Sequence, residues 1–141
     1  VNVEMSELNA CFGRWQLREW EKIEAQRQKN YSILYKMLSG KDNISVWPFF
    51  NDRKDSPFVF PILYKVGTVD DVFERLSVKG IEIRTLMGGG AVCQQNAFQG
   101  KVVFDNCDNA SYLSGHTFFV GCHHTLSESD IEYIGEQITM L

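Results

Sequence analysis

The chain has 141 residues, of which 44% are hydrophobic and 23% charged, and its formal net charge is −4. This length and composition predict one globular domain over residues 1–141. The basic residues are scattered among acids, without the basic stripe that a nucleic-acid partner needs, and no apolar run approaches the roughly 18 residues of a membrane helix. No secretory signal pattern is visible, so we expect a cytoplasmic protein that binds neither nucleic acid nor a membrane.

Four cysteines stand at positions 11, 93, 107 and 122, which would allow two disulfides. Their spacing is wide, and the chain is long enough to form a core without covalent links. We therefore expect free thiols in a reducing compartment. The chain begins at Val1 rather than at a methionine. We expect it to be a trimmed or truncated piece of a longer protein.

A long helix is predicted from Ser6 to Leu38, a stretch without proline. Leu8, Phe12 and Trp15 begin an apolar stripe, and charged side chains fill the opposite side. The Ser6 hydroxyl can cap the first free backbone N–H groups, and a Ser-Gly pair ends the helix. We expect the tryptophans and tyrosines of this helix to belong to the core.

The middle of the chain alternates between strands and helices. Residues 40–57 are rich in Gly, Asp, Asn and Pro and predict a long loop with a short strand inside it, and residues 58–64 predict an apolar strand. Pro61 lacks a backbone N–H, which favours an edge position or a bulge. Thr68 begins a capping box for the next helix, and strict alternation over residues 81–86 predicts a half-buried strand.

The last third begins with a Gly-rich loop over residues 87–101. Residues 105–114 predict a short helix with Ala110, Tyr112 and Leu113 turned inward, and the T-F-F-V run after it predicts a strand. Ser127 opens a second capping box, followed by an amphipathic final helix. Together these elements predict an α+β fold: a small three- or four-stranded, mostly antiparallel sheet with helices packed on one face, preceded by a long helix.

Two neighbouring features are suited to binding an anion. The backbone N–H groups of Gly88, Gly89 and Gly90 can approach a ligand closely, although three glycines are as typical of a flexible connection after a strand. Arg84 stands on the polar face of the preceding strand and can bind a carboxylate or phosphate through two hydrogen bonds. The simpler alternative for Arg84 is an exposed arginine paired with a nearby acid.

Cys122, His123 and His124 follow the last strand, and His116 stands six residues before Cys122. Structural zinc requires two spaced pairs of ligands, and adjacent histidines at a strand end point to opposite faces, so we expect no metal site here. The two adjacent histidines are better suited to lining a pocket. Cys93 could act as a nucleophile, but the sequence places no base beside it, and we assign no catalytic residue.

Several stretches resemble one known family in the order in which they occur. Residues 2–17, 80–95 and 117–131 are similar to three stretches of the DegT/DnrJ-type family, and Arg27, Tyr31 and Leu34 resemble positions in its long helix. These proteins are pyridoxal-phosphate (PLP)-dependent nucleotide-sugar aminotransferases and dehydratases of fold type I. The G-I-E-I-R and T-F-F-V-G-C-H-H segments look most like the sugar 3-dehydratase branch. The resemblance covers nearly the whole chain.

The resemblance implies that the chain is the C-terminal small domain of such an enzyme, acting in deoxysugar or lipopolysaccharide biosynthesis. In the family, a large N-terminal domain holds PLP and carries the catalytic lysine, or a histidine in the dehydratases. The resemblance also implies that Asn2 contacts the cofactor phosphate of a neighbouring subunit. The substrate-facing residues that it implies are Arg84, Gly88, Gly89, Gly90, Gln94, His123 and His124.

The sequence departs from the family pattern at several places. Glu4 replaces an arginine that contacts phosphate, and Thr85 replaces a proline. Gly90 and Cys122 each replace an asparagine, and no lysine occurs in the family's Schiff-base context. We therefore expect the isolated chain to bind no PLP and to be inactive alone. The resemblance implies a nucleotide sugar as the substrate of the full enzyme and a homodimer formed through the long N-terminal helix.

Two other functions stay open on the sequence. A stand-alone self-associating or ligand-binding module could reuse this fold, because the long aromatic-rich helix offers apolar surface for self-association. A small metal or thiol protein would be built on Cys107, Cys122, His116 and His123.

Overall fold

The computed structural model of the protein describes residues 5–48, 55–86, 90–98, 100–101 and 106–141. Within these residues the strands form a four-stranded sheet in the order β1-β2-β4-β3, and every neighbouring pair is antiparallel. The strands are β1 (Ile44–Val46), β2 (Val59–Tyr64), β3 (Ile83–Thr85) and β4 (Thr117–Gly121). The helices are α1 (Glu7–Leu38), α2 (Val69–Ser77), α3 (Asp108–His116) and α4 (Glu128–Thr139), with a short 3-10 helix, η2 (Val92–Gln94).

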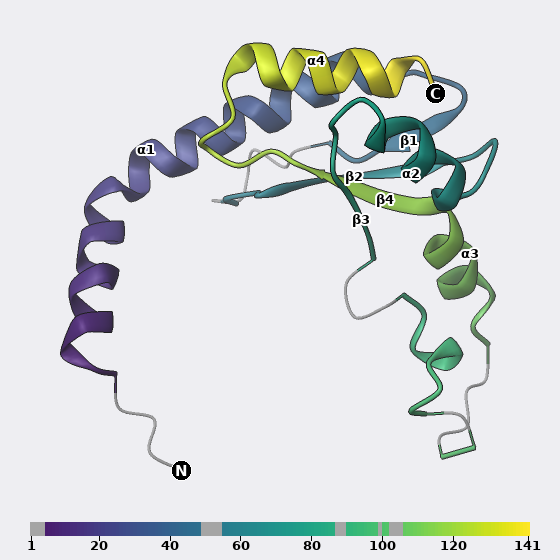
Figure 1. The fold of residues 1–141 in the computed structure, drawn as a ribbon, viewed down its shortest axis with the longest axis horizontal. Helices are drawn as coiled ribbons and strands as arrows, with labels where there is room; N and C mark the ends of the chain where they lie inside the picture. The colour runs from purple at the N-terminus through teal and green to yellow at the C-terminus, as the bar shows by residue number, and fades with distance from the viewer. Residues whose placement is uncertain (1–4, 49–54, 87–89, 99, 102–105) are drawn as a thin grey trace.

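One face of the sheet carries the hydrophobic core. Side chains alternate between the two faces of a strand, so Phe60, Ile62 and Tyr64 of β2 share a face with Phe118 and Val120 of β4. All five are buried in one cluster with the apolar sides of α1, α2 and α4. Figure 1 shows α1 and α4 side by side over the sheet. The predicted α+β fold is confirmed: the sheet is antiparallel, a long helix comes first, and α1, α2 and α4 pack on one face.

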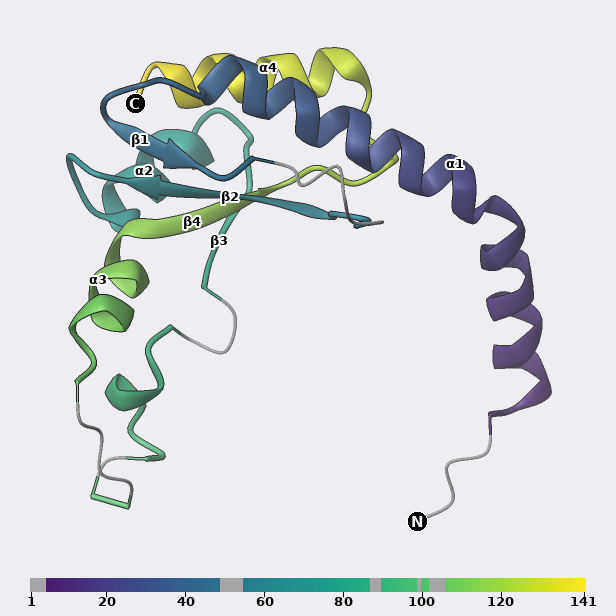
Figure 2. The same cartoon turned by 180° about the vertical axis from the view of Figure 1, so that it is seen from behind.

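The opposite face of the sheet is apolar but less covered. Val59, Pro61, Leu63 and Phe119 point to this side and are only half-buried. Figures 1 and 2 show α3 and η2 beyond this face, on the side of the sheet away from α1 and α4. We call Val59, Pro61, Leu63 and Phe119 the open sheet face.

Only the second half of α1 packs on the core. The helix is 32 residues long, which corresponds to about 48 Å, whereas the longest strand spans only about 20 Å. Its buried residues begin at Ile23, and the part before it, residues 7–22, projects beyond the sheet as an arm (Figures 1 and 2). Leu8 is 67% exposed and Trp15 57%. The prediction that the aromatic residues of this helix belong to the core is therefore right for Tyr31 and wrong for Trp15 and Trp20.

The two predicted capping boxes begin α2 and α4. The Thr68 hydroxyl accepts from the backbone N–H of Asp71, whose carboxylate accepts from the backbone N–H of Thr68. Ser127 and Asp130 make the same pair of contacts at the start of α4. No helix within the described ranges combines the length and the apolar character needed to cross a membrane.

Two predictions about individual residues are wrong: the burial of side chains in α3 and the edge position of Pro61. Ala110, Tyr112 and Leu113 of α3 are exposed, not turned inward, because α3 lies away from the face of the sheet that carries the core (Figure 1). β2 is an inner strand, so Pro61 is not on a sheet edge. Its pairing with β1 covers Ile62 to Tyr64 and so begins one residue after the proline, which means that the missing N–H of Pro61 removes no hydrogen bond from that ladder.

Candidate functional site

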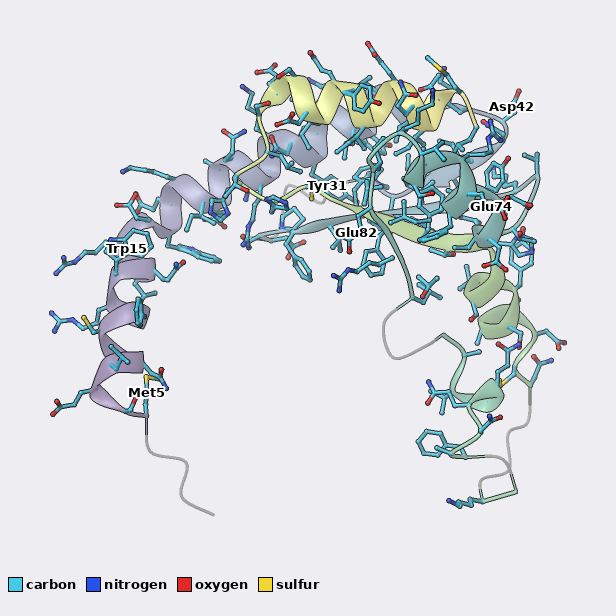
Figure 3. All side chains as sticks on the ribbon, viewed as in Figure 1. Met5, Trp15, Tyr31, Asp42, Glu74 and Glu82 are labelled. Carbon is cyan, nitrogen blue, oxygen red and sulfur yellow. A yellow bond between two sulfur atoms is a disulfide. The ribbon has the colours of Figure 1, made fainter. Side chains whose placement is uncertain are left out.

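A groove of about 1140 Å³ opens beside β3, the strand at one edge of the sheet. Its walls come from β3, the end of β4, the start of β2 and the facing sides of α2 and α4. We call it the β3 groove, and the label of Glu82 marks its position in Figure 3. The lining includes Phe73, Glu82, Arg84, Phe119, His123 and Tyr133.

Arg84 reaches the groove from β3 and pairs there with Glu82. Its Nε donates to Glu82 Oε1 at 3.1 Å, and its Nη2 lies 3.1 Å from the same oxygen. The two side chains are 74% and 76% exposed, and ion pairs at such exposure contribute little stability. Arg84 thus has the arrangement that the sequence offered as the simpler alternative, an exposed arginine paired with a nearby acid. Because the pair is weak, an incoming phosphate or carboxylate can replace Glu82.

His123 lies in the turn between β4 and α4 and lines the same groove. Its ring Nδ1 and the Thr125 hydroxyl are 2.7 Å apart, a hydrogen bond that orients the ring. Gly121 makes room for it, because a Cβ there would come within 3.3 Å of the ring. The structure thus brings two of the predicted substrate-facing residues, Arg84 and His123, to one groove.

His124 has different surroundings from its neighbour. It does not line the β3 groove, and its Nδ1 is buried without a hydrogen-bond partner in the described part of the chain. Across the residues that the structure describes, no three His, Cys, Asp or Glu side chains are placed to share a metal ion. The role of His124 in substrate binding stays a prediction.

Gly90 and Gln94 also stand apart from the groove lining. Gly90 has a φ of +88°, and a Cβ there would collide with the Ser114 side chain of α3. Glycine is thus required both for the backbone conformation and for the close approach to α3. Gln94 is exposed at the end of η2. The remaining predicted positions, Asn2, Gly88 and Gly89, lie outside the described residues.

A disulfide joins Cys93 to Cys107, contrary to the expectation of free thiols. It links η2 to the start of α3 across 14 positions of sequence, and the spacing of cysteines does not reveal which of them meet in space. With its sulfur paired, Cys93 is not available as a nucleophile. Cys11 is free and exposed, and Cys122 is free and buried. Burial raises the pKa of the Cys122 thiol to about 12, so it stays protonated at neutral pH.

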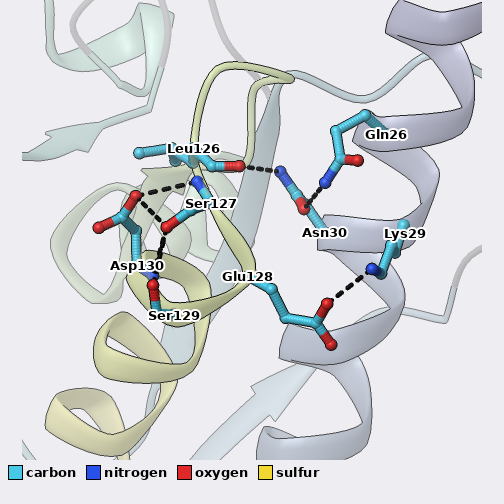
Figure 4. Close-up of polar contacts among 8 residues, drawn as sticks. All are labelled: Gln26, Lys29, Asn30, Leu126, Ser127, Glu128, Ser129 and Asp130. Atoms are coloured by element: carbon cyan, nitrogen blue, oxygen red, sulfur yellow. Dashed lines mark hydrogen bonds and ion pairs between the residues drawn. The ribbon is translucent and has the colours of Figure 1, made fainter.

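Asn30 of α1 is a fully buried polar residue that no motif singles out. Its Nδ2 donates to the His123 carbonyl at 2.9 Å and lies 3.5 Å from the carbonyls of Cys122 and Leu126. Its Oδ1 accepts from Gln26 Nε2 at 2.8 Å (Figure 4). The sequence held a signal for it, because the asparagine stands on the apolar side of the helix, one turn before a fully buried leucine. An unpaired amide there would be costly.

The β3 groove does not fit PLP by itself. The described residues that line it include no lysine to form a Schiff base. The described residues therefore do not form a complete cofactor site.

The sequence of the chain is similar to those of known proteins. The family model described as the DegT/DnrJ/EryC1/StrS aminotransferase family matches residues 1–139. The chain is also 25% identical over 138 residues to GDP-4-keto-6-deoxy-D-mannose 3-dehydratase of Escherichia coli O55:H7. That match covers 96% of this chain and 36% of the relative, so the chain spans little more than a third of the relative's length.

Solved structures show the same fold. A GDP-4-keto-6-deoxymannose-3-dehydratase with a trapped PLP-glutamate geminal diamine has a TM-score of 0.84 at 25% identity, over 97% of this chain and 36% of that one. The aminotransferase TlmJ from Streptoalloteichus hindustanus has a TM-score of 0.81 at 18% identity, over 94% of this chain and 35% of that one. Because the family model matches nearly the whole chain, this protein belongs to the DegT/DnrJ/EryC1/StrS aminotransferase family.

Proposed function

We propose that this chain is the C-terminal small domain of a PLP-dependent nucleotide-sugar 3-dehydratase or aminotransferase that acts in deoxysugar or lipopolysaccharide biosynthesis in the cytoplasm. One observation carries the proposal: the family match runs over residues 1–139, yet the chain spans 36% of the 3-dehydratase that it resembles. In this proposal the rest of the parent enzyme holds PLP and the catalytic lysine or histidine. The chain alone binds no cofactor and is inactive.

Two uncovered apolar surfaces support a larger parent enzyme. The arm of α1 exposes Leu8, Phe12 and Trp15. The open sheet face leaves side chains such as Leu63 and Phe119 half-buried. Contiguous apolar surface of this kind usually marks a contact with another part of an assembly. The length that the relatives have beyond this chain provides a domain able to cover it.

The β3 groove supports a role in substrate binding. Arg84 can bind the diphosphate of a nucleotide sugar through two charge-assisted hydrogen bonds. His123 can offer a ring nitrogen to a sugar hydroxyl. The other assignments stay predictions: Asn2 for the cofactor phosphate, and Gly88, Gly89, Gly90, Gln94 and His124 for the substrate.

A chimera tests this function directly. This chain would replace the matching C-terminal third of the Escherichia coli 3-dehydratase. We expect the chimera to bind PLP, seen as visible absorbance of the cofactor, and to turn over a 4-keto-6-deoxy nucleotide sugar. Arg84→Ala in the chimera should raise KM about tenfold with a smaller effect on kcat, because a contact made equally in the ground and transition states acts on KM.

Lys36 provides the matched control, because it is an exposed basic residue outside the groove. Lys36→Ala should leave both KM and kcat unchanged. A chimera that folds and holds PLP but turns over no nucleotide sugar, under conditions in which the parent 3-dehydratase is active, would contradict the proposed function.

A stand-alone self-associating module is the second candidate, and the exposed arm is the observation that favours it. Two arms packed against each other would bury Leu8, Phe12 and Trp15, which would also account for a homodimer formed through α1. Sedimentation equilibrium of the chain should then show a dimer, and Phe12→Glu should convert it to a monomer. A chain that stays monomeric at high concentration removes this candidate and leaves the chimera test unaffected.

A further inference from the structure

We propose that Asn30 is a positioning residue: from within α1 it fixes the turn after β4 so that the His123 ring faces the β3 groove. The inference rests on the proposed function, since it assigns a role in the same site. It concerns a residue that does not itself line the groove.

The turn over residues 122–126 presents several carbonyl groups to α1. Within it, the Leu126 N–H donates to the His123 carbonyl at 3.2 Å, and at its start the Cys122 N–H donates to the Phe58 carbonyl at 3.0 Å. The carbonyls of Cys122, His123 and Leu126 all lie within 3.5 Å of Asn30 Nδ2. Asn30 and Cys122 are fully buried, and buried polar groups need hydrogen-bond partners, so a side-chain amide at this point holds the turn in one conformation.

The orientation of the Asn30 amide is itself determined. An asparagine side chain has a donor end and an acceptor end, and only the donor end can satisfy carbonyls. Gln26, one turn earlier on α1, donates to Asn30 Oδ1 at 2.8 Å, which turns the Nδ2 end of Asn30 toward the turn (Figure 4). The asparagine is fully buried, so water does not compete for these hydrogen bonds.

The position of the His123 ring follows from the same turn. The ring is hydrogen-bonded to the hydroxyl of Thr125, two residues later within the turn, and it lies over Gly121 just before it. A second link from α1 to this region, between Lys29 and Glu128, is short at 2.6 Å but 53% exposed at both ends. Exposed ion pairs contribute little, so the buried amide is the contact that sets the turn.

If Asn30 had only a structural role, its replacement would lower the stability of the chain without a particular effect on His123. If Asn30 positions the His123 ring, its replacement should move that ring. Asn30→Leu keeps the volume and removes the donor. By NMR of the 141-residue chain, we expect the His123 ring signals and the amides of residues 122–126 to shift. The ring of His116 should not move, because its Nδ1 is bonded to the Gly67 carbonyl, outside this turn.

Leu34→Ala is the matched control, because Leu34 is fully buried one turn after Asn30 on the same helix. It should destabilise the chain and leave the His123 signals in place. The proposal is overturned if His123 is unchanged in folded Asn30→Leu, or if Leu34→Ala moves its signals equally. Should Asn30→Leu not fold, Gln26→Met removes only the orienting hydrogen bond. A smaller shift of His123 is then expected, and no shift overturns the proposal.

The active chimera gives the second measurement. There, Asn30→Leu should raise KM for the nucleotide sugar about tenfold with little change in kcat, and an unchanged KM overturns the link between Asn30 and the substrate. The NMR comparison needs neither cofactor nor substrate. If a chimera that folds and holds PLP turns over no nucleotide sugar, the proposed function fails, while the His123 signals still decide whether Asn30 positions the ring.

Discussion

Burial of a single thiol gives this protein a defined sensitivity to alkaline pH. Cys122 is fully buried at the end of β4, and its Sγ donates to the Pro57 carbonyl at 3.7 Å. Loss of hydration raises the pKa of this thiol to about 12, and the nearby charge of Arg27 opposes the shift only partly. The folded state therefore holds this proton more tightly than the unfolded state.

The sign of the pH effect follows from that difference. Below the unfolded pKa of about 9.0 both states hold the proton, and the stabilising contribution is complete. As pH rises from about 9 toward 12, only the unfolded state loses the proton, so the free energy of unfolding falls. The loss should be on the order of 1 kcal/mol at pH 10. Urea unfolding at pH 8 and pH 10 measures it, and an equal loss in Cys122→Ala would count against this cause.

At the scale of elements, the capping boxes determine where helices begin. At the start of α4, hydrogen bonds from the Ser127 side chain and then from its backbone lower the pKa of Asp130. The pKa of Asp71 is lowered at the start of α2 by the backbone and then the side chain of Thr68. In both boxes the charged carboxylate is the form that the fold favours.

Ser127→Ala should lower the free energy of unfolding by about 1 kcal/mol, because it leaves a first-turn N–H without its acceptor. Urea unfolding at pH 7 measures the difference.

The contribution of the Asp130 carboxylate to stability is complete above its ordinary pKa of 3.8 and is lost as pH falls through its lowered pKa. Urea unfolding at pH 7 and pH 3 should therefore show a smaller acid loss in Asp130→Asn than in the wild type. Glu132→Gln, elsewhere on α4, serves as the control and should keep the wild-type acid loss.

The disulfide between Cys93 and Cys107 is the second feature at this scale. Reduction should lower the free energy of unfolding by up to about 3 kcal/mol, because the unfolded chain gains the freedom of the opened loop. Thermal unfolding with and without reductant measures the change, and a Cys93→Ser, Cys107→Ser double variant should not respond. Thiol titration of the untreated, denatured protein should detect Cys11 and Cys122 alone. A titration that finds every cysteine free contradicts the disulfide.

For the whole molecule, the main asymmetry is between a packed body and the projecting arm of α1. Ile23 and the residues after it anchor the helix on the core, whereas Leu8, Phe12 and Trp15 touch little of it. In the proposed function the arm is covered by the rest of the parent enzyme. The stability of this chain should therefore depend on one half of α1 alone.

Trp15→Ser should change the free energy of unfolding of the chain by less than about 0.5 kcal/mol, because the side chain is 57% exposed. Leu34→Ala, in the packed half, should cost about 2–5 kcal/mol. Urea unfolding of both variants provides the comparison. A loss in Trp15→Ser as large as that in Leu34→Ala would mean that the arm packs on the body. In the chimera, by contrast, Trp15→Ser should destabilise the assembled enzyme.

Much of the fold could be predicted from the sequence, because its causes are local. Ser6, Thr68 and Ser127 mark helix starts through hydrogen bonds within a few residues, and Gly80, with a φ of +74°, follows the end of α2. Alternation of apolar and polar residues predicted the strands. Pro61 favoured an edge position for its strand, but β2 is an inner strand, because strand order depends on tertiary pairing. The family resemblance also came from ordered stretches of sequence, and the family model confirms it.

The sequence by itself determined the α+β class, the main helices and the family. Only the tertiary structure decided the features that depend on which distant segments meet. It joined Cys93 to Cys107, brought Arg84 and His123 to one groove, and placed Asn30 against carbonyls more than 90 positions away. The physical reason is that caps and periodicity act within a turn or two of the chain, whereas burial and pairing are properties of the packed molecule.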